Sequence, residues 1–368
     1  MTLVDPGSLR FRNAAEIRGY NALDYFTDAR AAQLDRFTQF GLIAAREAIA
    51  QSGIEWTPGL RERTAVVTGS AVGGQTTEDS AFAQLYRDGK TRMDPLNMTK
   101  VMANAVTSHI SIEFNLSGPG LTVSTACSSA NHAIGQAFWM VREGIADAAV
   151  AGGSEAPMSL GHLKAWEAMR VVSPDTCRPF SKGRNGIILG EGSAMLLLEP
   201  LEAARARGAG ILGELVGFGM SSDACHITAP SSQGAARAIR AALADAHLEP
   251  EDISYINAHG TGTALNDPAE TAAIQSVFGA HADCLAISST KSLHGHALGA
   301  SGALEACATV LALRHGVLPP TANFLAPDPE CDLDVIPNEA RPASCEYALS
   351  NSFAFGGLNA VIAFRRAP

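Results

Sequence analysis

The sequence predicts an α/β protein in which helices cover a buried, mostly parallel sheet. Helical and strand-like stretches alternate along the chain, and the helical stretches are rich in alanine. Apolar residues recur at helical spacing from Leu34 to Ala48, and Gly53 provides a stop signal for that helix. Short apolar runs that indicate buried strands follow at residues 64–68, 147–151, 253–256 and 285–289.

One of these strands has a counterpart earlier in the chain. Residues 121–126 read LTVSTA and residues 285–290 read LAISST, and each run is followed by an outlier, Cys127 in the first and Lys291 in the second. Each run then leads through an alanine-rich helix to an Arg-x-Gly sequence. This repeated order of elements predicts an internal duplication.

A second pair of segments supports the duplication. Residues 188–198 and 353–363 both combine glycine turns with an apolar strand. We therefore expect two related halves, residues 1–200 and residues 201–368. In such a duplication the equivalent strand ends face each other, so side chains far apart in sequence converge on one cleft.

Composition narrows the classes of function. The chain has 368 residues, 46% of them hydrophobic and 17% charged, so it can bury a large core. The formal net charge of −10 argues against nucleic acid as a partner, because phosphate neutralisation needs clustered Lys and Arg. No apolar run is long enough to span a bilayer, and the N-terminus does not have the order of a signal peptide. We expect a cytoplasmic protein without a transmembrane segment.

Cys127 is the candidate nucleophile. The seven cysteines are scattered without a C-x-x-C pair, so we expect reduced thiols and neither a disulfide framework nor a metal site. The other six have the context of buried structural residues. Cys127 instead lies where a strand gives way to a helix, and a helix N-terminus favours the thiolate.

Two histidines occupy the ends of later strands. His259 lies in the glycine-rich segment NAHGTGT directly after the apolar run ISYI, and His296 lies in KSLHGHALGASG just beyond another strand. Ligands of open α/β sheets bind at such strand ends. A single histidine there could merely bond to a backbone carbonyl, but two of them indicate a site.

Glu270 has a structural explanation that needs no catalysis. Asp267, Pro268 and Glu270 fit the N-cap, N1 and N3 positions of a helix start, with Glu270 reaching back to the cap. This reading and a functional one both stay open for Glu270 on the residues alone.

Four motifs carry a resemblance to a known family. They are STACSS at residues 124–129, NAHGTGT at 257–263, KSLHGH at 291–296 and NSFAFGGLN at 351–359. In this order they resemble the β-ketoacyl-acyl carrier protein synthases, the elongating type II condensing enzymes of the thiolase superfamily. The resemblance covers essentially the whole chain. The residues of the first and last motifs are most similar to those of the nodulation protein E group.

The resemblance implies a fold and a reaction. The fold would be a thiolase-like duplication, layered α-β-α-β-α, with two mixed and mostly parallel sheets. The reaction would be a decarboxylative Claisen condensation in fatty acid or polyketide-like synthesis. Cys127 would carry the acyl group, while His259 and His296 would contact the malonyl thioester and assist its decarboxylation. The backbone N–H groups of Cys127 and Phe355 would form the oxyanion hole, with Phe355 gating the acyl pocket.

The resemblance also assigns supporting residues and partners. Lys291 and Glu270 would form an ion pair beside His296, and Thr261 and Thr263 would hydrogen-bond the phosphopantetheine arm. No metal or redox cofactor is implied, because substrates arrive on the 4′-phosphopantetheine of an acyl carrier protein. The expected assembly is a homodimer, or a heterodimer with a related subunit.

The N-terminus departs from the family pattern. The family begins with a strand and a helix ahead of the position of Thr2, and this sequence has no such segment. We expect the first strand to be missing from the interior of the first half's sheet, which would leave backbone groups without partners.

Other readings compete with the synthase. A thiolase or a thioester hydrolase would also use an activated cysteine, but thiolases resemble a Cys-His-Cys arrangement and the third position here is His296. A non-catalytic partner subunit would lack the nucleophile, and Cys127 is present. An N-terminally truncated, inactive synthase is the remaining alternative.

Overall fold

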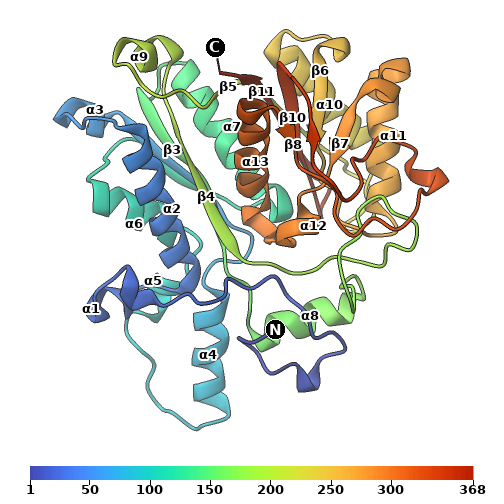
Figure 1. The fold of residues 1–368 in the computed structure, drawn as a ribbon. Coiled ribbons are helices and arrows are strands. Elements are labelled where there is room, and N and C mark those ends of the chain that lie inside the picture. Colours follow the sequence, from blue (N-terminus) through green and yellow to red (C-terminus); the bar gives the residue numbers. More distant parts are fainter. Residues whose placement is uncertain (368) are drawn as a thin grey trace.

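The computed structural model describes residues 1–367 and contains two main sheets (Figure 1). The first sheet has the strand order β2-β1-β3-β4, and only β4 runs antiparallel to its neighbour. Its strands are β1 Thr64–Gly69, β2 Gly120–Val123, β3 Ala148–Glu155 and β4 Gly192–Leu198.

The second sheet has the strand order β7-β6-β10-β11-β5, with β11 antiparallel to both β10 and β5. Its strands are β5 Gly213–Ser222, β6 Ile253–Asn257, β7 Ala286–Ser288, β10 Tyr347–Ala354 and β11 Leu358–Arg366. The four apolar runs that predicted buried strands coincide with β1, β3, β6 and β7. The predicted α/β class is confirmed.

Helices form three layers around these sheets. The inner helices α7 (Ser129–Arg142) and α13 (Ser301–His315) lie between the sheets, where their alanines pack with Phe218 and Tyr255 (Figure 1). On the outer faces, α2 (Arg36–Ser52) and α6 (Ala105–Phe114) cover the first sheet, and α10 (Ser232–Ala246) and α11 (Asn266–Phe278) cover the second. The layers are therefore α-β-α-β-α, as the resemblance implied.

Local sequence explains where α2 begins and ends. The Asp35 side chain accepts a hydrogen bond from the Phe37 N–H and caps the helix. Gly53 ends it with φ 61°, a left-handed conformation that glycine adopts without strain. The stop predicted at Gly53 is confirmed.

The first sheet lacks one strand that the second sheet has. In the second sheet β5 pairs with the outer side of β11. Within residues 1–367 no strand pairs with the outer side of β4, which lines a cavity of about 650 Å³. The strands β2, β1, β3 and β4 pair without a gap, so the expectation that a strand is missing from the interior of this sheet is wrong. The position equivalent to β5 is the open edge of β4.

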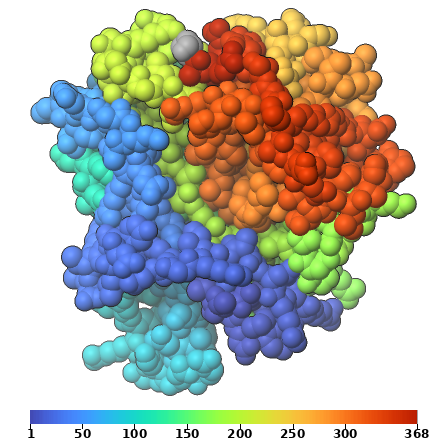
Figure 2. Space-filling model, viewed as in Figure 1, coloured from blue at the N-terminus to red at the C-terminus, as the bar shows by residue number. Residues whose placement is uncertain are grey.

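The remaining elements surround this core. The first segment of the chain lies on the surface as a band across the molecule (blue in Figure 2) and meets the middle of the chain where Ala15 bridges to Gly190. No helix among residues 1–367 is long and apolar enough to cross a membrane. The other helices and short strands are α1 Asp28–Ala31, α3 Pro58–Glu62, α4 Gln75–Tyr86, α5 Asn97–Val101, α8 Leu160–Met169, α9 Leu201–Ala206, α12 Lys291–His294, β8 Val317–Leu318 and β9 Arg341–Pro342.

Candidate active site

A pocket of about 420 Å³ lies where strands of both sheets end. Cys127 lines it from the segment after β2, and His259 and His296 line it from the segments after β6 and β7. The three residues predicted to carry the chemistry are therefore brought together, although the first lies more than a hundred residues before the others in the sequence.

Cys127 is held in a tight turn between β2 and α7. The turn is a short 3-10 helix, Ala126–Ser128, and Ala126 has the unusual φ of 51°. The Ser129 hydroxyl fixes the turn, because it donates to the Ala126 carbonyl and accepts from the Thr125 N–H. The backbone N–H groups of Phe355 and Cys127 itself lie close enough to the sulfur to lower its pKa.

Burial opposes the thiolate that the helix N-terminus favours. Burial raises the pKa of Cys127 to about 11, although the charge of Lys291 and the two N–H groups act in the opposite direction. Cys127 is only 6% exposed, so loss of water outweighs these favourable groups. Burial therefore favours the neutral thiol over the thiolate.

His259 follows β6, and a buried carboxylate holds its backbone. Glu270 accepts hydrogen bonds from the N–H groups of His259 and Gly260, both at 2.8 Å. The Asn351 amide also donates to Glu270, at 3.2 Å. Glu270 therefore fixes the backbone at His259 and Gly260.

This placement corrects two expectations for Glu270. It does not pair with Lys291, and it does not cap a helix. The helix α11 begins at Asn266 with Leu265 at the N-cap, and no side-chain cap is formed there. The two backbone N–H groups after β6 compete more effectively for the carboxylate than the helix end does.

Hydrogen bonds determine which ring nitrogen of His296 carries the proton. Its Nδ1 accepts the N–H of Leu298 at 3.1 Å, and the Ser301 hydroxyl lies 2.9 Å from the same atom. Because Nδ1 is an acceptor, a neutral His296 carries its proton on Nε2. Its ring lies edge-on to the ring of His259 with 5.6 Å between centroids.

Both histidines are neutral at physiological pH. Burial is the main reason why their pKa values lie well below 6.5, and the charge of Lys291 lowers them further. Neutral imidazoles can donate an N–H to an oxygen without first losing or gaining a proton.

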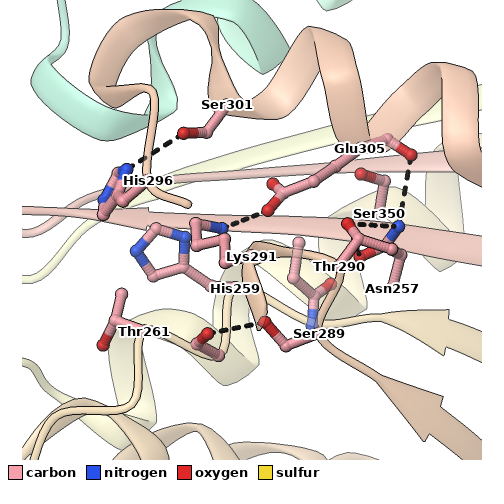
Figure 3. Close-up of polar contacts among 12 residues, drawn as sticks. Asn257, His259, Thr261, Ser289, Thr290, Lys291, His296, Ser301, Glu305 and Ser350 are labelled. Carbon is pink, nitrogen blue, oxygen red and sulfur yellow. Dashed lines mark hydrogen bonds and ion pairs between the residues drawn. The ribbon is translucent and has the colours of Figure 1, made fainter. Parts of the chain in front are cut away.

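Lys291 forms a buried ion pair with Glu305 behind the two histidines (Figure 3). Burial raises the pKa of Glu305 to about 7, and the lysine counteracts this effect. Sequence reasoning missed Glu305. The available signal was a single carboxylate within the otherwise apolar and alanine-rich helix α13.

The other predicted residues also border the pocket. Thr261 and Thr263 line it with their hydroxyl oxygens 2.9 Å apart, and Phe355 lines it from the turn after β10. Two further contributors were missed, namely Trp166 of α8, whose ring stacks on Phe355 at 6.0 Å, and the loop of residues 226–230. Among residues 1–367 no cluster of three or more His, Cys, Asp or Glu side chains could hold a metal ion.

Comparison with known proteins agrees with this geometry. Residues 19–204 match the β-ketoacyl synthase N-terminal domain, and residues 212–325 match the β-ketoacyl synthase C-terminal domain. Nodulation protein E of Rhizobium meliloti (strain 1021) is 50% identical over 333 residues, which cover 90% of this chain and 83% of that protein. The 3-oxoacyl-[acyl-carrier-protein] synthase 2 of Staphylococcus aureus (strain COL) is 40% identical over 373 residues, covering 100% of this chain and 90% of that one.

Solved structures show the same fold. The ishigamide ketosynthase/chain length factor superposes with a TM-score of 0.95 and 37% identity, covering 100% of this chain and 91% of that one. A type II polyketide ketosynthase, bound to its acyl-carrier protein and a hexaketide, superposes with a TM-score of 0.88 and 30% identity over 98% of this chain and 89% of that one. The chain therefore belongs to the β-ketoacyl synthase family and is a condensing enzyme of the acyltransferase type.

Proposed function

We propose that the chain condenses a malonyl thioester with an acyl group carried on Cys127, and that His259 and His296 serve the donor. The convergence of these three side chains on one pocket carries the proposal. The neutral state of both histidines supports it, because decarboxylation of a thioester requires hydrogen-bond donors and no charged base.

In the first step Cys127 accepts the acyl group. The sulfur attacks the thioester carbonyl, a new S–C bond forms, and the bond to the carrier sulfur breaks. The thiol proton leaves with the carrier thiol, so charge is conserved. The oxygen of the tetrahedral intermediate would accept the N–H groups of Cys127 and Phe355, which already lie beside the sulfur.

In the second step the malonyl donor loses CO2. Its C–C bond to the carboxylate breaks, and the electron pair forms an enolate whose oxygen accepts the Nε2–H of His296, with His259 alongside. The enolate carbon attacks the acyl carbonyl on Cys127. Collapse of the intermediate expels the thiolate, which takes up one proton from water, and a 3-oxoacyl thioester leaves.

The carrier is proposed to be an acyl carrier protein that presents substrates on 4′-phosphopantetheine. Thr261 and Thr263 are suited to bind the amides of such an arm, because their hydroxyls line the pocket beside the histidines. The steps above balance with groups of this chain, the two thioesters and one proton from water, so we propose that no metal or redox cofactor takes part. We place the enzyme in the cytoplasm, where such carriers reside.

We further propose a dimer formed with a second copy or a related subunit. Large apolar side chains are exposed on the neighbouring helices α4, α5 and α6, namely Phe82, Tyr86, Met98 and Ile112, and Met102 directly after α5 is exposed as well. Soluble monomers rarely expose so many large apolar side chains together. Molar mass in solution tests this assembly, and Ile112→Glu should shift it towards the monomer.

The reaction itself is tested by supplying labelled malonyl and acetyl carrier thioesters in parallel to the acyl-loaded protein. We expect CO2 and a 3-oxoacyl product from the malonyl donor. Efficient condensation from the acetyl donor without CO2 would instead indicate a thiolase. Neither loading of Cys127 nor product would indicate an inactive chain or a non-catalytic subunit.

A further inference from the structure

The turn after His296 repeats the backbone form of the turn that holds Cys127. In the first turn Ala126 has φ 51°, a 3-10 helix spans Ala126–Ser128, and Ser129 follows with φ −53° and ψ −46°. In the second turn Leu298 has φ 44°, a 3-10 helix spans Leu298–Ala300, and Ser301 follows with φ −53° and ψ −47°. The two turns lead into the inner helices α7 and α13.

This repetition identifies the counterpart of the nucleophile. Cys127 is the middle residue of its 3-10 turn, and Gly299 is the middle residue of the other. The pairing of Cys127 with Lys291 that the sequence indicated is therefore wrong, because the short helix α12 is inserted between β7 and the second turn.

The Glu155 carboxylate accepts hydrogen bonds from the second turn, in a position that we call the anion site at Gly299. One oxygen of Glu155, Oε2, accepts the N–H groups of Gly299 at 3.0 Å and Ala71 at 2.6 Å. The other oxygen accepts the Ser70 hydroxyl at 2.9 Å and the Val72 N–H at 3.3 Å. Two backbone N–H groups that converge on one oxygen have the arrangement of an oxyanion hole.

The contact is made between the two halves of the molecule. Glu155 lies at the end of β3 and is completely buried, and Ala71 belongs to the loop after β1. A Cβ atom at Gly299 would lie 2.3 Å from the Ala71 nitrogen and 2.6 Å from the Glu155 carboxylate. The second turn therefore approaches the first half so closely that no side chain fits between them.

The same turn orients an imidazole of the site. Leu298, directly before Gly299, donates its N–H to Nδ1 of His296, and Ser301 lies beside the same nitrogen (Figure 3). We propose that Glu155 is a positioning residue, whose carboxylate fills a second, non-catalytic backbone anion site at Gly299 and so holds the His296 turn against the first half. The inference rests on the proposed role of His296 in decarboxylation.

A buried carboxylate with only a general packing role is the simpler explanation, and chemical rescue distinguishes the two. Replacing Glu155 by alanine leaves the N–H groups of Gly299 and Ala71 around a space that a small anion fits. Formate supplies a carboxylate, whereas formamide has the same shape without the charge. Burial raises the pKa of Glu155 to about 7, although the four hydrogen bonds that its carboxylate accepts lower it.

The experiment measures three properties of Glu155→Ala in sodium formate, sodium chloride and formamide. They are the melting temperature, the rate of malonyl decarboxylation and the rate of alkylation of Cys127. We expect decarboxylation to fall about 10²-fold, because a displacement of about 1 Å costs that much. Alkylation should not fall, because the Ser129 hydrogen bonds hold the cysteine turn and because loss of the Glu155 charge, which raises the pKa of Cys127, favours the thiolate. Formate, but not formamide, should raise both the decarboxylation rate and the melting temperature.

Two variants test the same contact from other directions and keep the inference falsifiable if Glu155→Ala does not fold. Gly299→Ala should show the same selective loss without rescue by formate, because the Glu155 carboxylate is still present. Glu155→Gln can keep its oxygen at Gly299 and donate its amide to the Ser70 hydroxyl, and it loses the 3.3 Å bond from the Val72 N–H, so we expect at least about a tenth of the rate. Gly59→Ala, where a Cβ meets nothing within 4 Å, is the matched control and should behave as the wild type.

The inference is overturned if formate changes neither the melting temperature nor the rate, or if decarboxylation and alkylation fall equally. A wild-type protein that releases no CO2 would contradict the proposed function instead. In that case the response of the Glu155→Ala melting temperature to formate still decides whether the anion site exists.

Discussion

Lys291 pairs with Glu305, fourteen residues further along the chain, and neither side chain is exposed to solvent. The pair places a positive charge behind Cys127, His259 and His296, where it lowers the pKa of all three. Glu305 keeps this charge compensated inside the protein. The carboxylate is therefore as important to the site as the lysine that the family motif identifies.

Replacing Glu305 by alanine should destabilise the protein strongly. The lysine would be left buried without a partner, and loss of one member of a buried pair costs about 3–5 kcal/mol. Urea denaturation measures the change in the free energy of unfolding. The control is Glu202→Ala, which removes an exposed partner of Arg205 and should cost less than about 1 kcal/mol. Equal losses for the two variants would show that Lys291 reaches water or another partner.

Cys127→Ala should abolish formation of the acyl-enzyme and leave the fold intact. Cys127 is the cysteine whose sulfur lies beside both histidines in the pocket and near the Phe355 N–H. Intact-protein mass after incubation with an acyl carrier thioester detects the adduct. Cys225→Ala, at an exposed position, is the matched control and should still be acylated. An adduct that persists on another cysteine, with turnover retained, would refute the assignment.

The sequence predicts the α/β class and the three central residues from local signals, whereas the order of the layers came from the family resemblance. Apolar runs mark the strands, and Cys127, His259 and His296 each follow such a run. Glu305 and Glu155 were not foreseen, because their roles come from burial against groups distant in the chain. For Glu270 the spacing suggests a helix cap and the resemblance implies a pair with Lys291, but neither indicates the two N–H groups that the fold brings to its carboxylate.

The pKa of Cys127 has a direct consequence for its reactivity towards iodoacetamide. A thiol whose pKa is about 11 is mostly protonated at neutral pH, and its thiolate fraction grows with pH until that value is approached. The alkylation rate should therefore rise about tenfold per pH unit between about pH 6.5 and 9, without a plateau. Subtracting the rate of Cys127→Ala removes the reaction of the exposed Cys225 and Cys284. A rate that is constant above neutral pH would show that the helix end and Lys291 outweigh burial.

Replacing either histidine should affect malonyl decarboxylation but not the loading of Cys127. Alanine at either His259 or His296 should spare the loading of Cys127, because the oxyanion of that step is expected at backbone N–H groups, yet it should slow malonyl decarboxylation about 10²- to 10³-fold.

The reason is where charge develops: it builds on the donor's thioester oxygen, within reach of the imidazoles. The loss should be larger for His296→Ala, since Leu298 and Ser301 orient its ring, whereas Nδ1 of His259 has no hydrogen-bond partner within the described residues. Single-turnover acylation and CO2 release, measured on the same preparations, give the two rates. His281→Ala, outside the pocket, is the matched control. Equal slowing of loading and decarboxylation would mean that the imidazoles also activate the thiol, and an unchanged decarboxylation rate would remove them from the donor step.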